Sequence, residues 1–232
     1  MNISSTDNFD DFAADYRHLH NKNMKFLGGD SYYFAQAKVR HVRDHESETA
    51  LNILDIGCGD GLTAFCMAAL LHGCKITGID ISAESIDIAN TKKIPGAVFR
   101  TYNGIDFPFA ENSFDLLFIA GVLHHVSPVV QARIIEEAHR VLKNGGRIYV
   151  FEHNPYNPAT RYLVKTCPFD KYAKLIKSGS VISLMKSGQF KNIQSRYTTF
   201  FPQNNFFSAF HNVEKKLSWC PFGAQFYVRA IK

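Results

Sequence analysis

The residues of this chain best suited to chemistry gather around a glycine-rich turn. An apolar run, Asn52-Ile53-Leu54, leads into Asp55-Ile56-Gly57-Cys58-Gly59-Asp60-Gly61, and a helix-forming stretch follows directly. Glycines let the main chain turn sharply and lie against a ligand, and the start of the next helix presents free N–H groups to it. In an open parallel sheet, ligands bind where such strands end. The turn therefore predicts a binding site.

The spacing of these glycines separates two classes of nucleotide site. They stand at positions 57, 59 and 61, whereas the dinucleotide fingerprint GxGxxG would place its third glycine where this chain has Leu62. An NAD-dependent oxidoreductase is therefore the poorest fit.

A carboxylate closes the next predicted strand. Asp80 follows Gly78-Ile79, and an acidic residue at this place can accept hydrogen bonds from both hydroxyls of a ribose. Ile81 beside it can pack on an adenine face. These residues indicate an adenosine-bearing ligand, and the alternative is that Asp80 only caps the helix that begins near Ser82.

Short apolar runs alternate with helical stretches from Ala50 to Glu152, which predicts parallel strands with right-handed crossovers. The expected strands are Leu51–Ile56, Cys74–Ile81, Ala97–Tyr102, Phe114–Ala120 and Arg147–Glu152. The expected helices are Leu62–Leu71, Ser82–Ala89 and Val129–Leu142, the last stopped by Asn144-Gly145-Gly146. The fold class is thus α/β, with an open, doubly wound sheet covered on both faces.

The flanking segments are less regular. Residues 1–49 are expected to form an N-terminal helical cap, with one helix over Phe9–Leu19 and another after Ser31. After Glu152 we expect a helix at Val181–Lys186 and two further strands at Ile193–Phe201 and Gln225–Ile231, which bring the sheet to seven mostly parallel strands. The domain would span residues 50–232, with an aromatic insertion at 202–223 before the last strand.

Composition limits the classes of protein to consider. The chain has 232 residues and a formal net charge of +5, yet residues 150–232 carry 12 Lys and Arg against 3 Asp and Glu. This basic third indicates an anionic partner, such as a phosphate-bearing substrate, a membrane surface or nucleic acid, or else a solvated face without a partner. Five scattered cysteines without CxxC spacing indicate reduced thiols, no metal site and a cytoplasmic location. No signal peptide or membrane span is expected.

Taken together, the motifs resemble the class I S-adenosylmethionine-dependent methyltransferases, in particular the small-molecule, ubiquinone/menaquinone-type branch. The resemblance covers residues 50–152 and implies a Rossmann-like fold for them. Besides the glycine turn and Asp80, it rests on the segments Asn103-Gly104-Ile105-Asp106-Phe107-Pro108-Phe109, Asn112-Ser113-Phe114-Asp115, Val122-Leu123-His124-His125-Val126 and Arg140-Val141-Leu142-Lys143-Asn144-Gly145-Gly146.

The resemblance implies S-adenosyl-L-methionine as cofactor and a role for individual residues. Asp55, Gly57, Cys58 and Gly59 would border its methionine portion, and Asp80 with Ile81 would hold the adenosine. Asn103 and Gly104 would meet the adenine edge, although the family has Asp where this chain has Asn103. The remaining contacts implied are from Ala120, His125 and, in the N-terminal cap, Tyr16.

The expected reaction is in-line displacement of the activated methyl group, so the protein mainly orients the reactants and excludes water. If the acceptor begins protonated, a base is needed. The candidates are His125, His124 and His153, with Glu152 and Tyr16 as further options. The two adjacent histidines can equally be ordinary lining residues.

The leading hypothesis is a methyltransferase acting at oxygen on a small or lipid- or sugar-linked acceptor, with transient contact to a membrane surface as an option. Two alternatives stay open, an RNA methyltransferase, disfavoured because no RNA-binding motif is present, and a non-catalytic S-adenosylmethionine-binding protein. DNA is not an expected partner. Asn154-Pro155-Tyr156-Asn157 resembles an amino-methyltransferase signature but follows the wrong strand, and we expect a rigid turn there. The insertion is either local core or a substrate lid.

Overall fold

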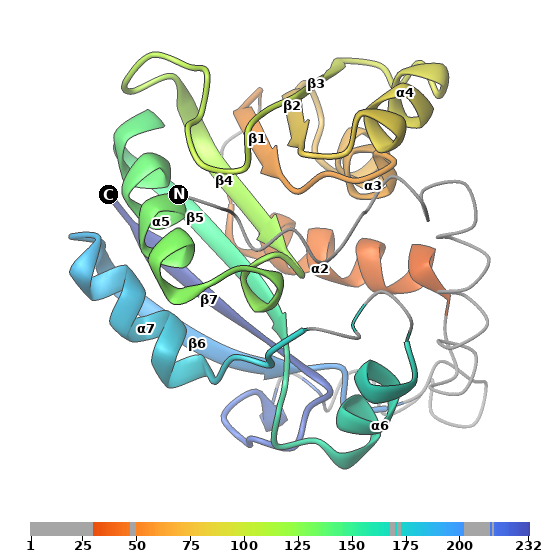
Figure 1. The fold of residues 1–232 in the computed structure, drawn as a ribbon, viewed down its shortest axis with the longest axis vertical. Coiled ribbons are helices and arrows are strands. Elements are labelled where there is room, and N and C mark those ends of the chain that lie inside the picture. Colours follow the sequence, from red (N-terminus) through yellow and green to blue (C-terminus); the bar gives the residue numbers. More distant parts are fainter. Residues whose placement is uncertain (1–29, 47–49, 168–169, 171–172, 202–213, 215) are drawn as a thin grey trace.

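A computed structural model provides the coordinates (Figure 1). It describes residues 30–46, 50–167, 170, 173–201, 214 and 216–232. The predicted helix at Phe9–Leu19, Tyr16 and most of the 202–223 insertion lie outside the described residues. The N-terminal cap and the domain boundary at residue 50 therefore stay predictions.

The described residues build one seven-stranded sheet in the order β3-β2-β1-β4-β5-β7-β6. Its strands are β1 (Asn52–Ile56), β2 (Lys75–Asp80), β3 (Ala97–Thr101), β4 (Phe114–Ala120), β5 (Leu142–His153), β6 (Lys191–Thr198) and β7 (Gln225–Ile231). β1 to β5 pair in parallel, while β7 is antiparallel to both β5 and β6. Six strands thus share one direction, which confirms the doubly wound, mostly parallel sheet.

Helices cover both faces of this sheet and bury two apolar clusters (Figure 1). The described helices are α2 (Ser31–His45), α3 (Leu62–Leu70), α4 (Ala83–Thr91), α5 (Pro128–Val141), α6 (Pro158–Thr166) and α7 (Ser178–Ser187). A 3₁₀ turn, η3 (Leu123–His125), follows β4. α2 and α3 pack on one face, and α5 and α7 on the other. The near-continuous burial of β1 and β4 follows from this double cover.

Local sequence signals place most of these elements where the pattern predicts them. β4 and β7 match their predicted bounds, and Gly188 ends α7 as expected. Ser82 caps α4 by accepting a hydrogen bond from the Ser85 amide. The helices and strands of the 50–152 region agree within one or two residues, except at the start of β5.

Two predicted strand bounds were wrong. β5 begins at Leu142, because the Asn144-Gly145-Gly146 turn lies in an irregular start of the strand, where its register with β4 shifts. β6 spans Lys191–Thr198 and not Ile193–Phe201. The turn predicted after β5 is present, and it leads into a helix that was not predicted, since Asn157 caps α6 through the Thr160 amide and Pro158 occupies its first position.

No helix in the described part of the chain is long and apolar enough to cross a membrane.

A buried carboxylate ties α2 to the sheet. Glu46, whose side chain is 4% exposed, contacts Arg147 at 2.5 Å, the Tyr149 hydroxyl at 2.5 Å and Arg229 at 3.6 Å. These partners lie on β5 and β7, so the Glu46 carboxylate fixes the end of α2 over these two strands.

We expect Glu46→Gln to lower the free energy of unfolding by about 2–3 kcal/mol, because two largely buried guanidinium groups lose their counter-charge. Chemical denaturation of both proteins measures this loss. Glu136→Gln on α5, which removes only an exposed pair with Arg133, is the matched control and should change stability by less than about 0.5 kcal/mol.

Candidate active site

The glycine turn is tied to the end of the neighbouring strand. The amides of Gly57 and Cys58 donate to the Ile79 carbonyl at 2.8 and 3.1 Å. The Gly59 amide donates to Oδ2 of Asp80 at 2.8 Å. Because β1 and β4 are neighbours whose following helices lie on opposite faces, this turn borders the crevice at the switch point of the sheet.

The glycines are needed for different reasons. All three have positive φ, +72° at Gly57, +52° at Gly59 and +78° at Gly61, a region that L side chains rarely adopt. A Cβ on Gly57 would lie 2.3 Å from Cγ2 of Val122. A Cβ on Gly59 would meet no atom of the described residues within 4 Å, its chain neighbours apart. As far as the described residues go, the space above Gly59 is thus open, as a turn that lies against a ligand requires.

Asp80 holds the turn as well as facing the crevice. Its Oδ2 accepts from Gly59 and its Oδ1 accepts from the Ser82 amide at 3.0 Å. Asp80 therefore helps to cap the start of α4, as the alternative interpretation suggested. A carboxylate oxygen can accept more than one hydrogen bond, so a role with ribose hydroxyls is compatible with this geometry.

Asp55 is the least satisfied carboxylate at this edge. It is 2% exposed, and its Oδ2 has no hydrogen-bond partner among the described residues. Burial, reinforced by repulsion from Asp80, raises the pKa of Asp55 to about 7, although Lys38 on α2 lowers it. A buried acceptor without a partner is costly, and a cationic or hydrogen-bonding ligand at this place would relieve the cost.

The other predicted cofactor residues differ in their surroundings. Ile81 is 45% exposed beside the turn, as a residue that packs on a ligand can be. The Asn103 carbonyl oxygen already accepts from the amides of Ile105 and Asp106 at 2.9 and 2.8 Å, and its amide donates to Asp106. Its adenine role stays a prediction and would require one of these bonds to yield. Gly104 has φ +81°, and Ala120 ends β4 at the crevice.

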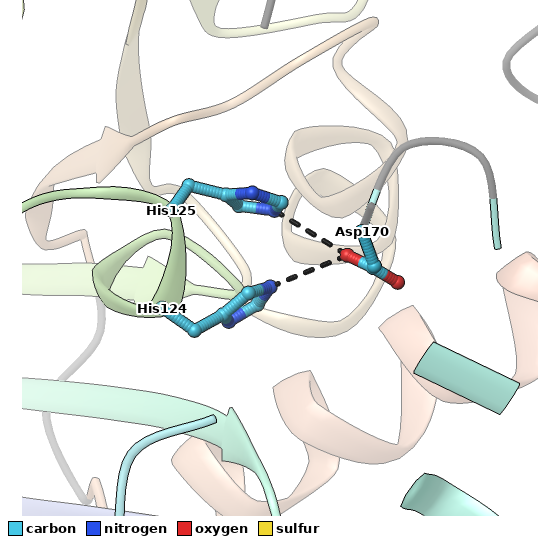
Figure 2. A group of neighbouring side chains, drawn as sticks. All are labelled: His124, His125 and Asp170. Carbon is cyan, nitrogen blue, oxygen red and sulfur yellow. Dashed lines mark ion pairs between the residues drawn. The ribbon is translucent and has the colours of Figure 1, made fainter. Parts of the chain in front are cut away.

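The predicted histidines come together with an acidic residue that the sequence pattern did not reveal. His124 and His125 form η3, and Nε2 of each lies 3.5 Å from Oδ1 of Asp170 (Figure 2). Behind them, Nδ1 of His124 lies 2.5 Å from Oε2 of Glu152 at the end of β5. The His153 ring lies 5.4 Å from that of His124. Asp170 stands 45 residues after His125, in a stretch without periodicity or motif.

These groups have very different proton affinities. Burial lowers the pKa of His124, but Glu152 and Asp170 outweigh it and raise it to about 10. Burial and the adjacent His124 lower the pKa of His125 to about 4 and that of His153 to about 3. His124 is therefore protonated and positively charged at neutral pH. Of the three histidines it is the least suited to act as base.

Comparison with known proteins agrees with this geometry. Residues 54–150 match the family described as a methyltransferase domain. The chain contains a methyltransferase domain. This agrees with the class that the motifs indicate, the class I S-adenosylmethionine-dependent methyltransferases. A demethylmenaquinone methyltransferase from Chlorobaculum parvum is 34% identical over 67% of this chain and 62% of its own length.

Other proteins resemble this chain over a shorter stretch or at lower identity. A 27-O-demethylrifamycin SV methyltransferase from Amycolatopsis mediterranei is 34% identical over 41% of this chain and 36% of its own. A solved S-adenosylmethionine-dependent methyltransferase from Thermotoga maritima is 20% identical, has a TM-score of 0.69 and covers 97% of this chain and 98% of its own, which supports the fold. The chain spans 62% and 57% of the length of the two Chlorobaculum relatives that it matches.

The pKa of Asp55 leads to a stability prediction. A pKa near 7 in the folded state, against 3.8 for the free group, means that the folded chain holds an extra proton between about pH 4 and 7. Stability from this group is therefore lost as the pH rises through that window. The compared quantity is the melting temperature of ligand-free Asp55→Asn minus that of the wild type. We expect this difference to be more positive at pH 8 than at pH 5 by at least ~3 °C.

Differential scanning calorimetry of the two proteins at both pH values measures this shift. Asp115 is the control, because its pKa is lowered below 3.8 by bonds to Lys143 and Asn52 that outweigh burial. Asp115→Asn should lower the melting temperature equally at pH 5 and pH 8. An Asp55→Asn difference that does not change with pH would contradict the assignment.

Proposed function

We propose that this chain is an S-adenosylmethionine-dependent methyltransferase that transfers a methyl group to oxygen on a small or lipid- or sugar-linked acceptor. The observation that carries the proposal is the crevice itself. There, among the described residues, a buried Asp55 oxygen has no hydrogen-bond partner near the end of β1, and the space above Gly59 on the following turn is open. The match of residues 54–150 to a methyltransferase domain supports it.

The residues at the crevice fit this cofactor by charge and shape. S-adenosylmethionine carries a sulfonium and an ammonium group against one carboxylate, so a net positive ligand is brought to an edge that holds Asp55 and Asp80. Asp55, Gly57 and Gly59 would border the methionine portion, and Asp80 would accept hydrogen bonds from the ribose hydroxyls. Cys58 is buried beneath the turn, so its part in binding is through the main chain.

The sulfonium group supplies a methyl activated for in-line displacement. The chain then has to orient the acceptor and exclude water. η3 and the end of β5 place the histidine cluster directly after the strands that border the crevice. Among these residues, His125 and His153 are neutral and are the candidates to receive a proton from the acceptor.

A cavity beside α6 is the proposed acceptor site. It has a volume of about 520 Å³ and is lined by Arg161, Val164, Lys165, Thr166, Cys167, Asp170, Ala173 and Leu175. Two basic side chains at its wall favour an acceptor with an anionic group, in line with the basic C-terminal third. Relatives named for demethylmenaquinone and for 27-O-demethylrifamycin SV support a small-molecule acceptor. The name of the second relative refers to a methyl group on oxygen of its own acceptor.

Calorimetric titration with S-adenosylmethionine, S-adenosylhomocysteine and NAD tests the cofactor. We expect the first two to bind and NAD not to bind. Asp80→Ala should weaken S-adenosylmethionine binding at least tenfold, because the ribose and the Gly59 amide both lose an acceptor. Asp87→Asn, an exposed carboxylate on α4, is the control and should bind as wild type. NAD binding would overturn the proposal.

A pair of glycines tests the location of the site. Gly59 and Gly145 both have positive φ, and a Cβ on either would meet no atom within 4 Å in the part of the chain that the structure describes, its chain neighbours apart. Alanine at each should cost a similar ~1–2 kcal/mol of stability from backbone strain. Only Gly59→Ala should weaken S-adenosylmethionine binding, by at least tenfold, because only its Cβ enters the crevice. Equal affinity in the two variants would mean that the cofactor lies elsewhere.

A further inference from the structure

We propose that His124, His125 and Asp170 form a binding site for a divalent first-row transition metal ion, with Zn²⁺ as the reference ion. The three residues are drawn together in Figure 2, where both imidazole rings point toward the same carboxylate oxygen. One ligand atom from each, Nε2 of the two histidines and Oδ1 of Asp170, lie within 4.8 Å of one another. Two imidazoles and one carboxylate are a common ligand set for such ions.

The two distances to Asp170 fit a shared ion better than hydrogen bonds. Each Nε2–Oδ1 separation is 3.5 Å, longer than the usual 2.7–3.2 Å of an N–H···O bond. Two ligands bound at about 2.1 Å with a tetrahedral angle between them are about 3.4 Å apart. Asp170 Oδ1 is equally distant from both nitrogens, as an oxygen that shares one ion with them would be.

A carboxylate behind the site fixes the orientation of one ligand. Glu152, 2% exposed, accepts at Nδ1 of His124, and its other oxygen accepts from the Leu123 amide at 2.8 Å. An ionised carboxylate only accepts, so Nδ1 keeps its hydrogen, and a metal ion would displace the Nε2 proton of His124 to bind on the side of Asp170. Metal-binding histidines regularly have such a carboxylate on their far nitrogen, where it fixes the tautomer and raises the basicity of the ligand.

Charge and access also suit a dication. Glu152 and Asp170 bring two negative charges to a place where their side chains are 0% and 14% exposed. A dication between the histidines and Asp170 would compensate both, which relieves the cost of burying them. Asp170 also lines the cavity beside α6, so an ion could enter from that side.

The use of such an ion rests on the proposed function. Three protein ligands leave a fourth position of a tetrahedral ion open, which is the arrangement of catalytic and not of structural sites. An oxygen of the acceptor at this position would lose its proton more readily, since a bound metal ion lowers the pKa of its oxygen ligands. The site would thus activate the hydroxyl and fix its position for methyl transfer.

Calorimetric titration of the tag-free, chelator-treated full chain with Zn²⁺ tests the site, with Co²⁺ absorption as a second readout of the coordination. We expect one equivalent to bind and tetrahedral Co²⁺ bands to appear. Asp170→Asn and His125→Ala should each weaken binding at least tenfold. Glu152→Gln should weaken it by about 10–100-fold, as carboxylates behind metal ligands do. Circular dichroism confirms that each variant is folded.

Two control variants exclude adventitious binding. His72→Ala removes an exposed histidine, and Cys167→Ser removes a thiol that lines the same cavity. Both should bind the ion as wild type does. Binding that survives Asp170→Asn and His125→Ala, or that is lost in Cys167→Ser, would overturn the proposed ligands.

Titration with S-adenosylmethionine on the same preparations separates this inference from the proposed function. Cofactor binding without one-to-one metal binding would overturn the metal site alone, whereas failure of the cofactor to bind would overturn the proposed function. Where both bind, the chelator should reduce methyl transfer to an acceptor at least tenfold, and added Zn²⁺ should restore it. Unchanged transfer would overturn the activating role of the ion.

Discussion

The structure depends on how it compensates negative charge buried at one edge of a parallel sheet. Parallel strands bring their carboxyl ends together, and here they gather the buried Asp55 and Glu152 and the half-buried Asp80. Charged groups in such surroundings are costly unless each finds a partner. The loops that follow these strands, and the ligands that the edge accepts, can be understood as solutions to this one constraint.

The three carboxylates solve it in different ways. Both oxygens of Asp80 accept hydrogen bonds from backbone amides, and these bonds hold the glycine turn in place before any ligand binds. Glu152 holds His124 and the Leu123 amide, so it builds the second half of the site. Asp55 has an oxygen without such a bond in the described chain. The fold thus prepares two carboxylates as supports and leaves the third to be satisfied by a positively charged ligand.

The sequence predicted those parts of the molecule that have a period or a spacing. The seven strands follow from apolar runs, and the glycine turn with Asp80 follows from residue order. α6 was missed because Pro155 and Pro158 indicate a turn, although a proline at the first position of a helix is favourable. Asp170 was missed because nothing local distinguishes it, and only the tertiary fold brings it to His125. The local hydrogen bonds of Asn103 were not predicted, although short polar side chains readily bond to their own loop.

Several of the matched motifs are structural and lie on the cofactor side. Arg140 donates to the Phe107 and Phe109 carbonyls and pairs with Glu137, so it clamps the loop that follows Asn103. The methyltransferase domain match ends at residue 150, whereas the lining of the cavity beside α6 begins at Arg161. The part of the chain that fits the general cofactor site is therefore separate from the part that would contact the acceptor. Asp170 connects the two parts in space, since it lines that cavity and faces the histidines of η3. Acceptor choice and methyl transfer would thus meet at this one carboxylate.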